Sequence, residues 1–342
     1  MSDLLPRDYA PRSTLELEEH FVEKPRFPAI DAHNHDMFWI SRYGIPSVSN
    51  LVEVMDRCGI TAIVNLDGKW GHHLEVHLDK YDRAYPGRFC TFANVDWSRW
   101  NEPDFGEKMA AQLEESVAAG ARGLKIYKTL GLELRDETGA LLWPDDARWD
   151  PIWATAGELG IPVMIHLADP PCFWEPLDRH NEGYLILKGH PQWNHHGPQF
   201  LGFRELMDSG LRLMGRHPDT VFIAAHTGWF AGLRFVGEQM LDKLPNVHVD
   251  FSACISILGR QPYSMRQFLI EYQDRVLFGT DSTPSTEVYH SYYRWLETKD
   301  EYFEVSWDLP WGDRRIYGVH LPDGVLEKIY CKNAQRLIPG LS

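Results

Sequence analysis

The chain alternates short apolar runs with longer amphipathic stretches, and no other feature restricts its fold as strongly. The runs are rich in branched residues and almost continuously apolar, as expected of strands buried on both faces of a parallel sheet. The stretches between them have helical periodicity. The apolar runs span 27–32, 61–66, 89–95, 123–127, 162–167, 221–225, 247–251 and 276–278, and the helical stretches span 48–58, 105–119, 149–159, 203–216, 233–243 and 263–272.

Eight strand candidates alternating with helices favour a closed barrel over an open, doubly wound sheet. We therefore predict an α/β protein with one (β/α)8 TIM barrel domain over residues 27–342, and keep the open sheet as the alternative. Residues 1–26 are polar and rich in Glu, which predicts an N-terminal arm with room for one short helix. Segments 169–199, after the fifth strand, and 293–321, before the last helix, are longer than ordinary loops. The aromatic-rich 169–199 insert is expected to form a lid or a substrate wall.

Charge and cysteine content restrict the partners and the compartment. The formal net charge is −15, and no block of Lys or Arg is present, so we expect neither nucleic-acid nor membrane-surface binding. Five scattered cysteines without a CxxC pair indicate a reducing compartment. Without a signal peptide or a membrane-length apolar run, we expect a cytoplasmic protein with a small-molecule substrate. The aromatic inserts are compatible with a homo-oligomer.

Metal-binding side chains end several of the predicted strands. In TIM barrels the active site lies at the carboxyl ends of the strands. His33 and His35 follow the first strand, and period-two alternation places them on one face. His166, His226 and Asp281 end the fifth, sixth and eighth strands. One such His is more often a hydrogen-bonded core residue, and Asp281 could cap a helix, but the joint pattern predicts a site for Zn²⁺, Mn²⁺ or Fe²⁺.

Lys125 alternates with apolar residues in the fourth strand and is therefore expected to point into the barrel. A buried ammonium group is costly unless it is paired or functional. It could neutralise an interior carboxylate such as Asp281, anchor a substrate carboxylate, or be carbamylated and bridge two metal ions. We favour the anchor or ion-pair role over the bridging role.

Several motifs, in this order along the chain, resemble those of the amidohydrolase superfamily and, within it, the amidohydrolase-2 group. They cover nearly everything from residue 27 onward and are specific for fold and superfamily, not for substrate. The motifs are DAHNH, GLKIYK, GIPVMIHLADP, HPDTVFIAAHTG, LPNVHVDFSA, RVLFGTD and VLEKIYCKNAQRL.

The resemblance implies roles for these residues. His33, His35 and His166 would be metal ligands, and Asp281 would be the fourth ligand or a base beside the metal. His226 would polarise the substrate or activate water. A mononuclear member needs no lysine ligand, whereas a binuclear member has a carbamylated lysine where Lys125 lies. One or two ions of zinc or manganese are therefore expected.

The resulting hypothesis is a metal-dependent hydrolase that cleaves an amide, lactone or ester of a small, aromatic or carboxylated substrate with activated water. Tyr127, Trp229 and Arg260 are candidate substrate contacts. The alternative enzyme is a non-oxidative decarboxylase of an aromatic or conjugated acid, which would use the same residues. The third hypothesis is a metal-containing binding protein without catalysis.

Overall fold

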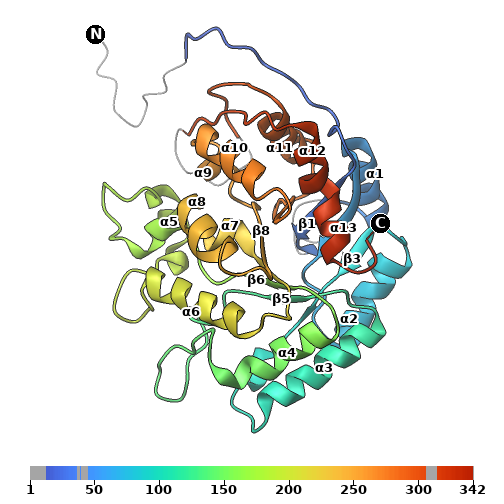
Figure 1. The fold of residues 1–342 in the computed structure, drawn as a ribbon, viewed down its shortest axis with the longest axis vertical. Coiled ribbons are helices and arrows are strands. Elements are labelled where there is room, and N and C mark those ends of the chain that lie inside the picture. Colours follow the sequence, from blue (N-terminus) through green and yellow to red (C-terminus); the bar gives the residue numbers. More distant parts are fainter. Residues whose placement is uncertain (1–12, 37–38, 40–44, 306–313, 342) are drawn as a thin grey trace.

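The computed structural model describes residues 13–36, 39, 45–305 and 314–341. Within these residues, short parallel strands lie at the centre and helices surround them (Figure 1). The strands are β1 (Ala29–Asn34), β2 (Ile60–Asn65), β3 (Phe89–Thr91), β4 (Ala93–Asn94), β5 (Leu124–Ile126), β6 (Val163–Ile165), β7 (Phe222–Ala224), β8 (Val247–Asp250) and β9 (Val276–Leu277).

The helices follow the strands in regular alternation. Those of the first half are α1 (Val48–Cys58), α2 (Gly71–Leu78), α3 (Phe105–Ala119), α4 (Asp150–Glu158), α5 (Tyr184–Gly189) and α6 (Phe203–Arg216). Those of the second half are α7 (Ala225–Trp229), α8 (Leu233–Phe235), α9 (Ile255–Leu258), α10 (Pro262–Glu271), α11 (Thr286–Glu297), α12 (Asp323–Glu327) and α13 (Asn333–Leu337). The π-helical segments η3 (Asp79–Arg83), η8 (Val236–Leu241) and η9 (Lys328–Lys332) continue α2, α8 and α12.

The described strands occupy eight positions, because β3 and β4 belong to one apolar run that is interrupted at Phe92. Their ladders give two sheets, β1-β2-β3 and β4 to β9 in sequence order. At the interruption, the backbone N–H of Phe92 donates to Asn65 (2.9 Å), and that of Ala93 donates to Gly123 (2.8 Å). The run therefore hydrogen-bonds to β2 with its first half and to β5 with its second.

No regular ladder joins β9 to β1 among the described residues, but two backbone hydrogen bonds cross this seam. Ala32 donates to the carbonyl of Phe278 (2.9 Å), and Asp281 donates to that of His33 (2.8 Å). Gly279 permits this approach, since a Cβ there would lie 2.8 Å from the Cβ of His33. The seam therefore places the strand end that carries Asp281 beside the strand that carries His33.

The buried Asp31 carboxylate also holds the seam. It accepts hydrogen bonds from the Thr280 backbone N–H (2.9 Å) and hydroxyl (2.6 Å), from Asn34 Nδ2 (2.9 Å) and from Tyr289 (3.1 Å). Burial raises the pKa of Asp31 to about 6 despite these donors.

Strand side chains alternate between two apolar clusters. The larger cluster lies between strands and helices, and the smaller one fills the interior of the barrel. The interior cluster includes Ile30 of β1, Met164 of β6, Ile223 of β7 and Leu277 of β9. Because side chains fill the interior of the barrel, the space for a reaction site lies at the strand ends.

Three of the predicted helices, 48–58, 105–119 and 203–216, coincide with α1, α3 and α6. The first strand begins two residues later than predicted and continues to Asn34, so His33 lies within β1. Helices α2 and α11 were not predicted. α2 begins with three residues of weak helical preference, and α11 carries four Tyr or Trp side chains that mask its periodicity.

The two long segments contain local structure. The insert holds the short helices η6 (Pro171–Trp174), α5 and η7 (Pro191–Trp193), and its buried side chains Phe173, Ile186 and Leu187 pack against Ile257 of α9. The second long segment, predicted to begin at residue 293, begins only after Glu297, because α11 continues to that residue. Its residues 306–313 lie outside the described ones.

Residues 13–26 contain neither helix nor strand, so the described part of the predicted arm has no short helix. The arm lies along the barrel near α11 (Figure 1). His20 binds Asp300 through its backbone N–H (2.8 Å) and its Nδ1 (2.5 Å). The rest of the predicted arm, 1–12, lies outside the described residues.

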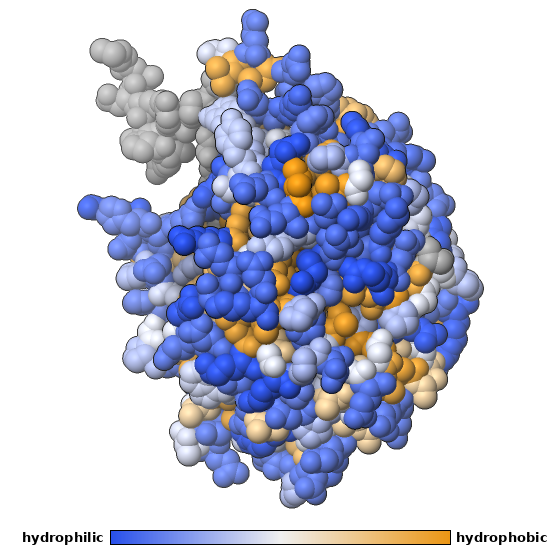
Figure 2. All heavy atoms as spheres, in the orientation of Figure 1, coloured by the Kyte–Doolittle hydropathy of each residue, from blue (hydrophilic) through white to orange (hydrophobic). Residues whose placement is uncertain are grey.

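The face drawn in Figure 2 is mainly hydrophilic, with small, separate apolar areas. In the part of the chain that the structure describes, no helix has both the length and the apolar character needed to cross a bilayer. All five cysteines are free thiols, and Cys172 is the least buried.

Candidate active site

His33, His35 and Asp281 converge at the carboxyl ends of β1 and β9. Asp281 Oδ1 lies 3.9 Å from His33 Nε2 and 3.5 Å from His35 Nε2. One donor atom from each of the three residues falls within 4.8 Å of the others, a compact group suited to one metal ion. The alternative reading of Asp281 as a helix cap does not hold, because Ser285 caps α11.

Buried carboxylates orient both histidine rings. His33 Nδ1 donates to Asp250 Oδ2 (2.7 Å), and His35 Nδ1 donates to Asp67 Oδ1 (2.8 Å). In the neutral form of either ring, this contact places the proton on Nδ1 and the lone pair on Nε2, which faces Asp281. Carboxylate partners of this kind fix the tautomer and the orientation of metal-binding histidines.

Asp67 and Asp250 were not predicted as site residues from the sequence. Asp250 is the last residue of β8, and Asp67 lies two residues after β2. The same criterion that selected Asp281, a carboxylate at the end of a strand, could have found both. Their role depends on contacts with residues distant in the sequence, and the sequence pattern does not reveal those contacts.

His226 lies beside the convergent group. Its Nδ1 donates to the Ser252 carbonyl (2.8 Å), so its Nε2 lone pair faces Asp281 Oδ2 at 3.9 Å and His166 Nδ1 at 3.2 Å. His166, predicted as a metal ligand, contacts His226 and, through Nε2, the Ala168 carbonyl (3.2 Å). The structure therefore brings His166 into contact with His226, which lies between it and Asp281 of the convergent group.

A left-handed turn positions His226. His226, Thr227 and Gly228 have φ between 51° and 64° and ψ between 48° and 58°, and Trp229 and Phe230 also have positive φ. Such a conformation costs roughly 1–2 kcal/mol for each non-glycine residue. The observed strand β7 therefore ends at Ala224, one residue before the predicted end at residue 225, because the turn begins there. The Phe230 ring stacks on that of His226 with centroids 5.1 Å apart.

Lys125 points into the barrel, as its alternation predicts, and only 1% of it is exposed. Its Nζ lies 3.3 Å from His33 Nε2. Burial lowers the pKa of Lys125 to about 8, against the opposing effect of Asp281, Asp250 and Asp67. Burial, together with the nearby Lys125 charge, lowers the pKa of His33 to about 4.

The other site groups are also displaced from their ordinary protonation. Burial lowers the pKa of His226 and holds that of His166 well below its usual range. For Asp281, burial alone would raise the pKa, but the neighbouring His33, His35, His226 and Lys125 together lower it. At neutral pH the site therefore holds an ionised Asp281 and neutral His33, His166 and His226.

The three predicted substrate contacts differ in position. The Tyr127 hydroxyl lies 3.3 Å from His35 Nδ1 and donates to Asp67, so it belongs to the site. Trp229 is fully buried and donates to the Ile165 carbonyl (2.8 Å), which places it in the core rather than on a substrate surface. Arg260 pairs with Glu182 of the insert, so its guanidinium already has a carboxylate partner.

The insert is tied to the strand ends at Asp169. This carboxylate accepts two hydrogen bonds from Lys128 Nζ (both 2.7 Å) and one from His195 Nε2 (2.8 Å), and it lies 3.8 Å from His166 Nε2. The pairing leaves the Lys128 side chain only 24% exposed. Lys128 also lies 5.5 Å above the Trp193 ring.

The donor set of His33, His35 and Asp281 fits a divalent cation such as zinc or manganese. Two imidazole lone pairs and one ionised carboxylate oxygen face a common point, and the protons lie on the opposite nitrogens. A second group, His33, His226 and Asp250, is also compact. It does not fit a metal, because the Ser252 hydroxyl lies within 3.1 Å of all three side chains.

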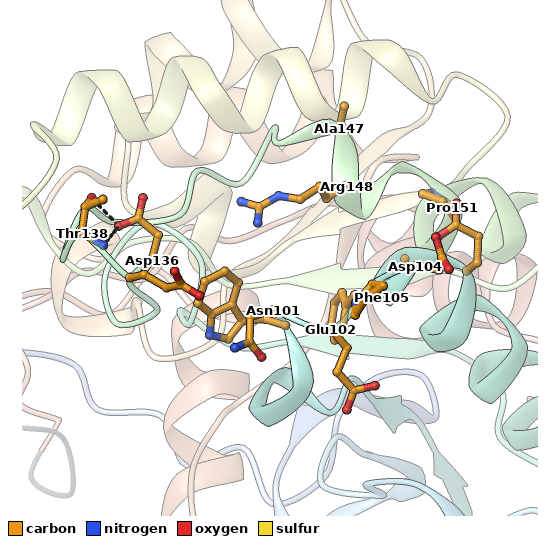
Figure 3. A pocket seen from close by; sticks show the side chains of 14 residues that line it. Asn101, Glu102, Asp104, Phe105, Asp136, Thr138, Ala147, Arg148 and Pro151 are labelled. Atoms are coloured by element: carbon orange, nitrogen blue, oxygen red, sulfur yellow. Dashed lines mark hydrogen bonds between the residues drawn. The ribbon is translucent and has the colours of Figure 1, made fainter.

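A separate cavity of about 690 Å³ opens between the segments 100–107 and 136–151 (Figure 3). Its wall carries the acidic residues Glu102, Asp104, Glu107, Asp136 and Glu137. None of the convergent histidines or Asp281 lines it, so it is not the reaction site.

Comparison with solved structures supports the barrel. A TIM-barrel protein from Bordetella bronchiseptica is 16% identical over 92% of this chain and 98% of its own, with a TM-score of 0.54. A 2,6-dihydroxybenzoate decarboxylase from Rhizobium is 18% identical over 91% and 98%, with a TM-score of 0.57. A dihydroxybenzoic acid decarboxylase from Polaromonas sp. JS666, with bound manganese and the inhibitor 2-nitroresorcinol, is 18% identical over 91% and 97%, with a TM-score of 0.56. At such low sequence identity, these similarities show only that the fold is shared. They confirm the predicted TIM barrel.

The family follows from the sequence profile. None of the curated proteins compared with this chain is similar enough to count as a match. The profile of the family Amidohydro_2, described as amidohydrolase, matches residues 77–340, which is more than half of the chain. The match begins after His33 and His35, so the assignment of these two residues rests on the geometry above. The chain belongs to the amidohydrolase family, as its motifs predicted.

Proposed function

We propose that this amidohydrolase-family enzyme hydrolyses an amide, lactone or ester of a small molecule at the site of His33, His35 and Asp281. The observation that carries the proposal is the convergence of Asp281 Oδ1 with Nε2 of His33 (3.9 Å) and of His35 (3.5 Å), while a carboxylate holds each ring at Nδ1. A resting site of this kind holds proton acceptors at its centre, as attack by water requires.

His33, His35 and Asp281 would hold the cation, with His166 as a further candidate ligand. A divalent cation there would supply the charge that lowers the pKa of water and polarises a carbonyl group. Zinc and manganese both suit the donor set, and we favour one ion over two.

Asp281 accepts the proton of the attacking water, whose oxygen forms a bond to the carbonyl carbon. The bond from that carbon to the leaving nitrogen or oxygen then breaks, and Asp281 returns the proton to the leaving atom. His226 Nε2 can accept or return the same proton, because its Nδ1 hydrogen is held by Ser252. That tautomer favours the proposed water-activating role of His226 over polarisation of the substrate.

A second candidate, decarboxylation of an aromatic or conjugated acid, is favoured by Lys125 and the insert. The buried Lys125 ammonium could hold a carboxylate beside His33. In the insert, the rings of Trp193 and His190 stack at 4.1 Å, and the rings of Trp193 and Phe173 stack at 6.4 Å. Flat surfaces of this kind suit a planar substrate.

One experiment separates the two candidates. The protein, loaded with Mn²⁺ or Zn²⁺, is incubated with a panel of esters, amides, lactones and aromatic acids, and CO2 is measured alongside new carboxylate, alcohol or amine. Hydrolysis predicts new carboxylate without CO2, and Asp281→Asn should slow it by about 10²-fold or more. CO2 release would replace the hydrolase proposal by the second candidate. Turnover that survives His33→Ala would contradict both.

A further inference from the structure

One buried carboxylate, Asp250 at the end of β8, contacts two different parts of the site. Its Oδ2 accepts from His33 Nδ1 (2.7 Å), and its Oδ1 accepts from the backbone N–H of His226 (3.0 Å). Oδ1 also accepts from the N–H (3.0 Å) and hydroxyl (2.6 Å) of Ser252. Asp250 is completely buried, so solvent replaces none of these partners.

We propose that Asp250 is a positioning residue that sets both the metal-facing nitrogen of His33 and the left-handed turn that carries His226. The inference rests on the proposed metal site but not on the reaction performed there.

Asp250 first determines the tautomer of His33. With Asp250 ionised, the ring keeps its proton on Nδ1, and the Nε2 lone pair faces Asp281 and Lys125. Burial alone would raise the pKa of Asp250, but His33 and the other hydrogen-bond donors hold it below its usual range. Without this acceptor, the remaining partner of Nδ1 is the Ser252 hydroxyl at 2.9 Å, which can donate to that nitrogen as well as accept from it. The proton can then move to Nε2, where it blocks metal binding.

Asp250 also holds the turn after β7. His226 has φ 55° and ψ 49°, and Thr227 has φ 51° and ψ 58°, a costly conformation for residues with a Cβ. Asp250 holds this turn twice, through Oδ1 to the N–H of His226 and through its own carbonyl, which accepts from the Thr227 hydroxyl (3.2 Å).

An Asn at position 250 cannot accept hydrogen bonds both from His33 and from the turn that carries His226. If its oxygen faces His226 and Ser252, its NH2 group opposes the Nδ1–H of His33. If the amide is reversed, the NH2 group opposes the N–H groups of His226 and Ser252. Either orientation leaves a buried pair of donors facing each other, so Asp250→Asn should disturb the site while changing the volume of the side chain very little.

The test compares Asp250→Asn with the control Asp82→Asn. The Asp82 carboxylate, in η3, accepts hydrogen bonds from the Thr91 backbone N–H (2.9 Å) and hydroxyl (2.6 Å), and neither residue belongs to the metal site. Calorimetric titration with Mn²⁺ and with Zn²⁺ should give 10- to 100-fold weaker binding for Asp250→Asn and about twofold or less for Asp82→Asn. Equal losses in the two variants would overturn the inference.

A second readout needs no metal. Long-range ¹⁵N–¹H spectra of the histidine rings distinguish Nδ1–H from Nε2–H tautomers. One buried ring should change from Nδ1–H to Nε2–H in Asp250→Asn and in neither the wild type nor Asp82→Asn. An unchanged set of tautomers would contradict the proposal. If the wild type binds neither metal, the proposed function fails, while these spectra still decide the role of Asp250.

A milder variant covers the case in which Asp250→Asn does not fold. Ser252→Ala removes the hydroxyl that contacts His33 and His226 but leaves the Asp250–His33 hydrogen bond in place. We expect Ser252→Ala to retain the His33 tautomer and to weaken metal binding less than tenfold. A change of the His33 tautomer in Ser252→Ala would assign the positioning role to Ser252 instead.

Discussion

His33 and His35 use the same arrangement, in which Nδ1 binds a buried carboxylate and Nε2 faces Asp281. The two carboxylates come from different strand ends, Asp250 from β8 and Asp67 from beyond β2. Each ring is therefore held by a carboxylate at Nδ1 and directs Nε2 toward Asp281, and Lys125 Nζ lies 3.3 Å from Nε2 of His33. Asp281, whose own φ of 50° is in the left-handed region, completes the group from the seam between β9 and β1.

Asp281→Asn should lower kcat/KM by about 10²- to 10⁴-fold on any substrate that the panel identifies. The amide neither accepts the proton from water nor supplies the negative charge that faces His33 and His35. Steady-state kinetics on metal-loaded protein measures the loss. The control is Asp219→Asn, an exposed residue, which should behave as the wild type. Activity within tenfold of the wild type for Asp281→Asn would exclude Asp281 as the base.

Substitution of Lys125 tests whether the site holds one metal ion or two. Lys125→Met keeps the length of the side chain and removes the ammonium group beside His33. We expect one equivalent of metal per chain in both proteins, and a KM for a carboxylated substrate at least tenfold higher in the variant. Elemental analysis of protein purified without chelator gives the stoichiometry. Two equivalents in the wild type and one or none in Lys125→Met would instead indicate that this lysine bridges two ions.

Among the elements, the 169–199 insert joins the rest of the molecule largely through polar contacts and one small apolar cluster. Asp169 secures it at the base through Lys128 and His195. On its far side it contacts α9 through a small apolar cluster, and Glu182 pairs with Arg260 and Arg314. Few buried apolar contacts imply a low free energy of local opening, which suits a lid.

Phe173→Ala should release the insert without unfolding the barrel. Phe173 is 2% exposed, and its loss removes the centre of the small cluster at a cost of about 3 kcal/mol. Because the barrel core is a separate cluster, the expected signature is faster hydrogen exchange at Leu187 and His195 with little change in Tm. Tyr184→Ala, at an exposed position of α5, is the control. Cooperative loss of the whole fold in Phe173→Ala would show that the insert is not a local unit.

For the whole molecule, the alternation of strands and helices was sufficient to predict the barrel, because local periodicity records which faces are buried. It was also sufficient to place His33, His35, His226 and Asp281 at one end. It could not predict the left-handed turn at His226, which is held by contacts to Asp250 from another strand. Partners distant in sequence determine which nitrogen, oxygen or backbone conformation each residue presents, and periodicity does not encode them.

The barrel interior also predicts acid sensitivity through His248 of β8. This ring is 4% exposed, and its Nδ1 has no hydrogen-bond partner among the described residues. Burial, followed by the charges of Arg275 and Arg336, lowers its pKa to about 3. Below pH 6.5 the unfolded chain binds a proton that the folded ring refuses, so the free energy of unfolding falls as the pH decreases.

From pH 7.5 to 5, this linkage removes about 2 kcal/mol of stability, and His248→Leu should lack that loss. Urea unfolding of both proteins at the two pH values measures the difference, and the exposed His72→Gln variant serves as the control with the wild-type slope. Because other buried groups titrate in the same range, the decisive quantity is the difference between variants rather than the slope of either one. Identical pH dependence in the wild type and His248→Leu would mean that the folded barrel accommodates the charged ring.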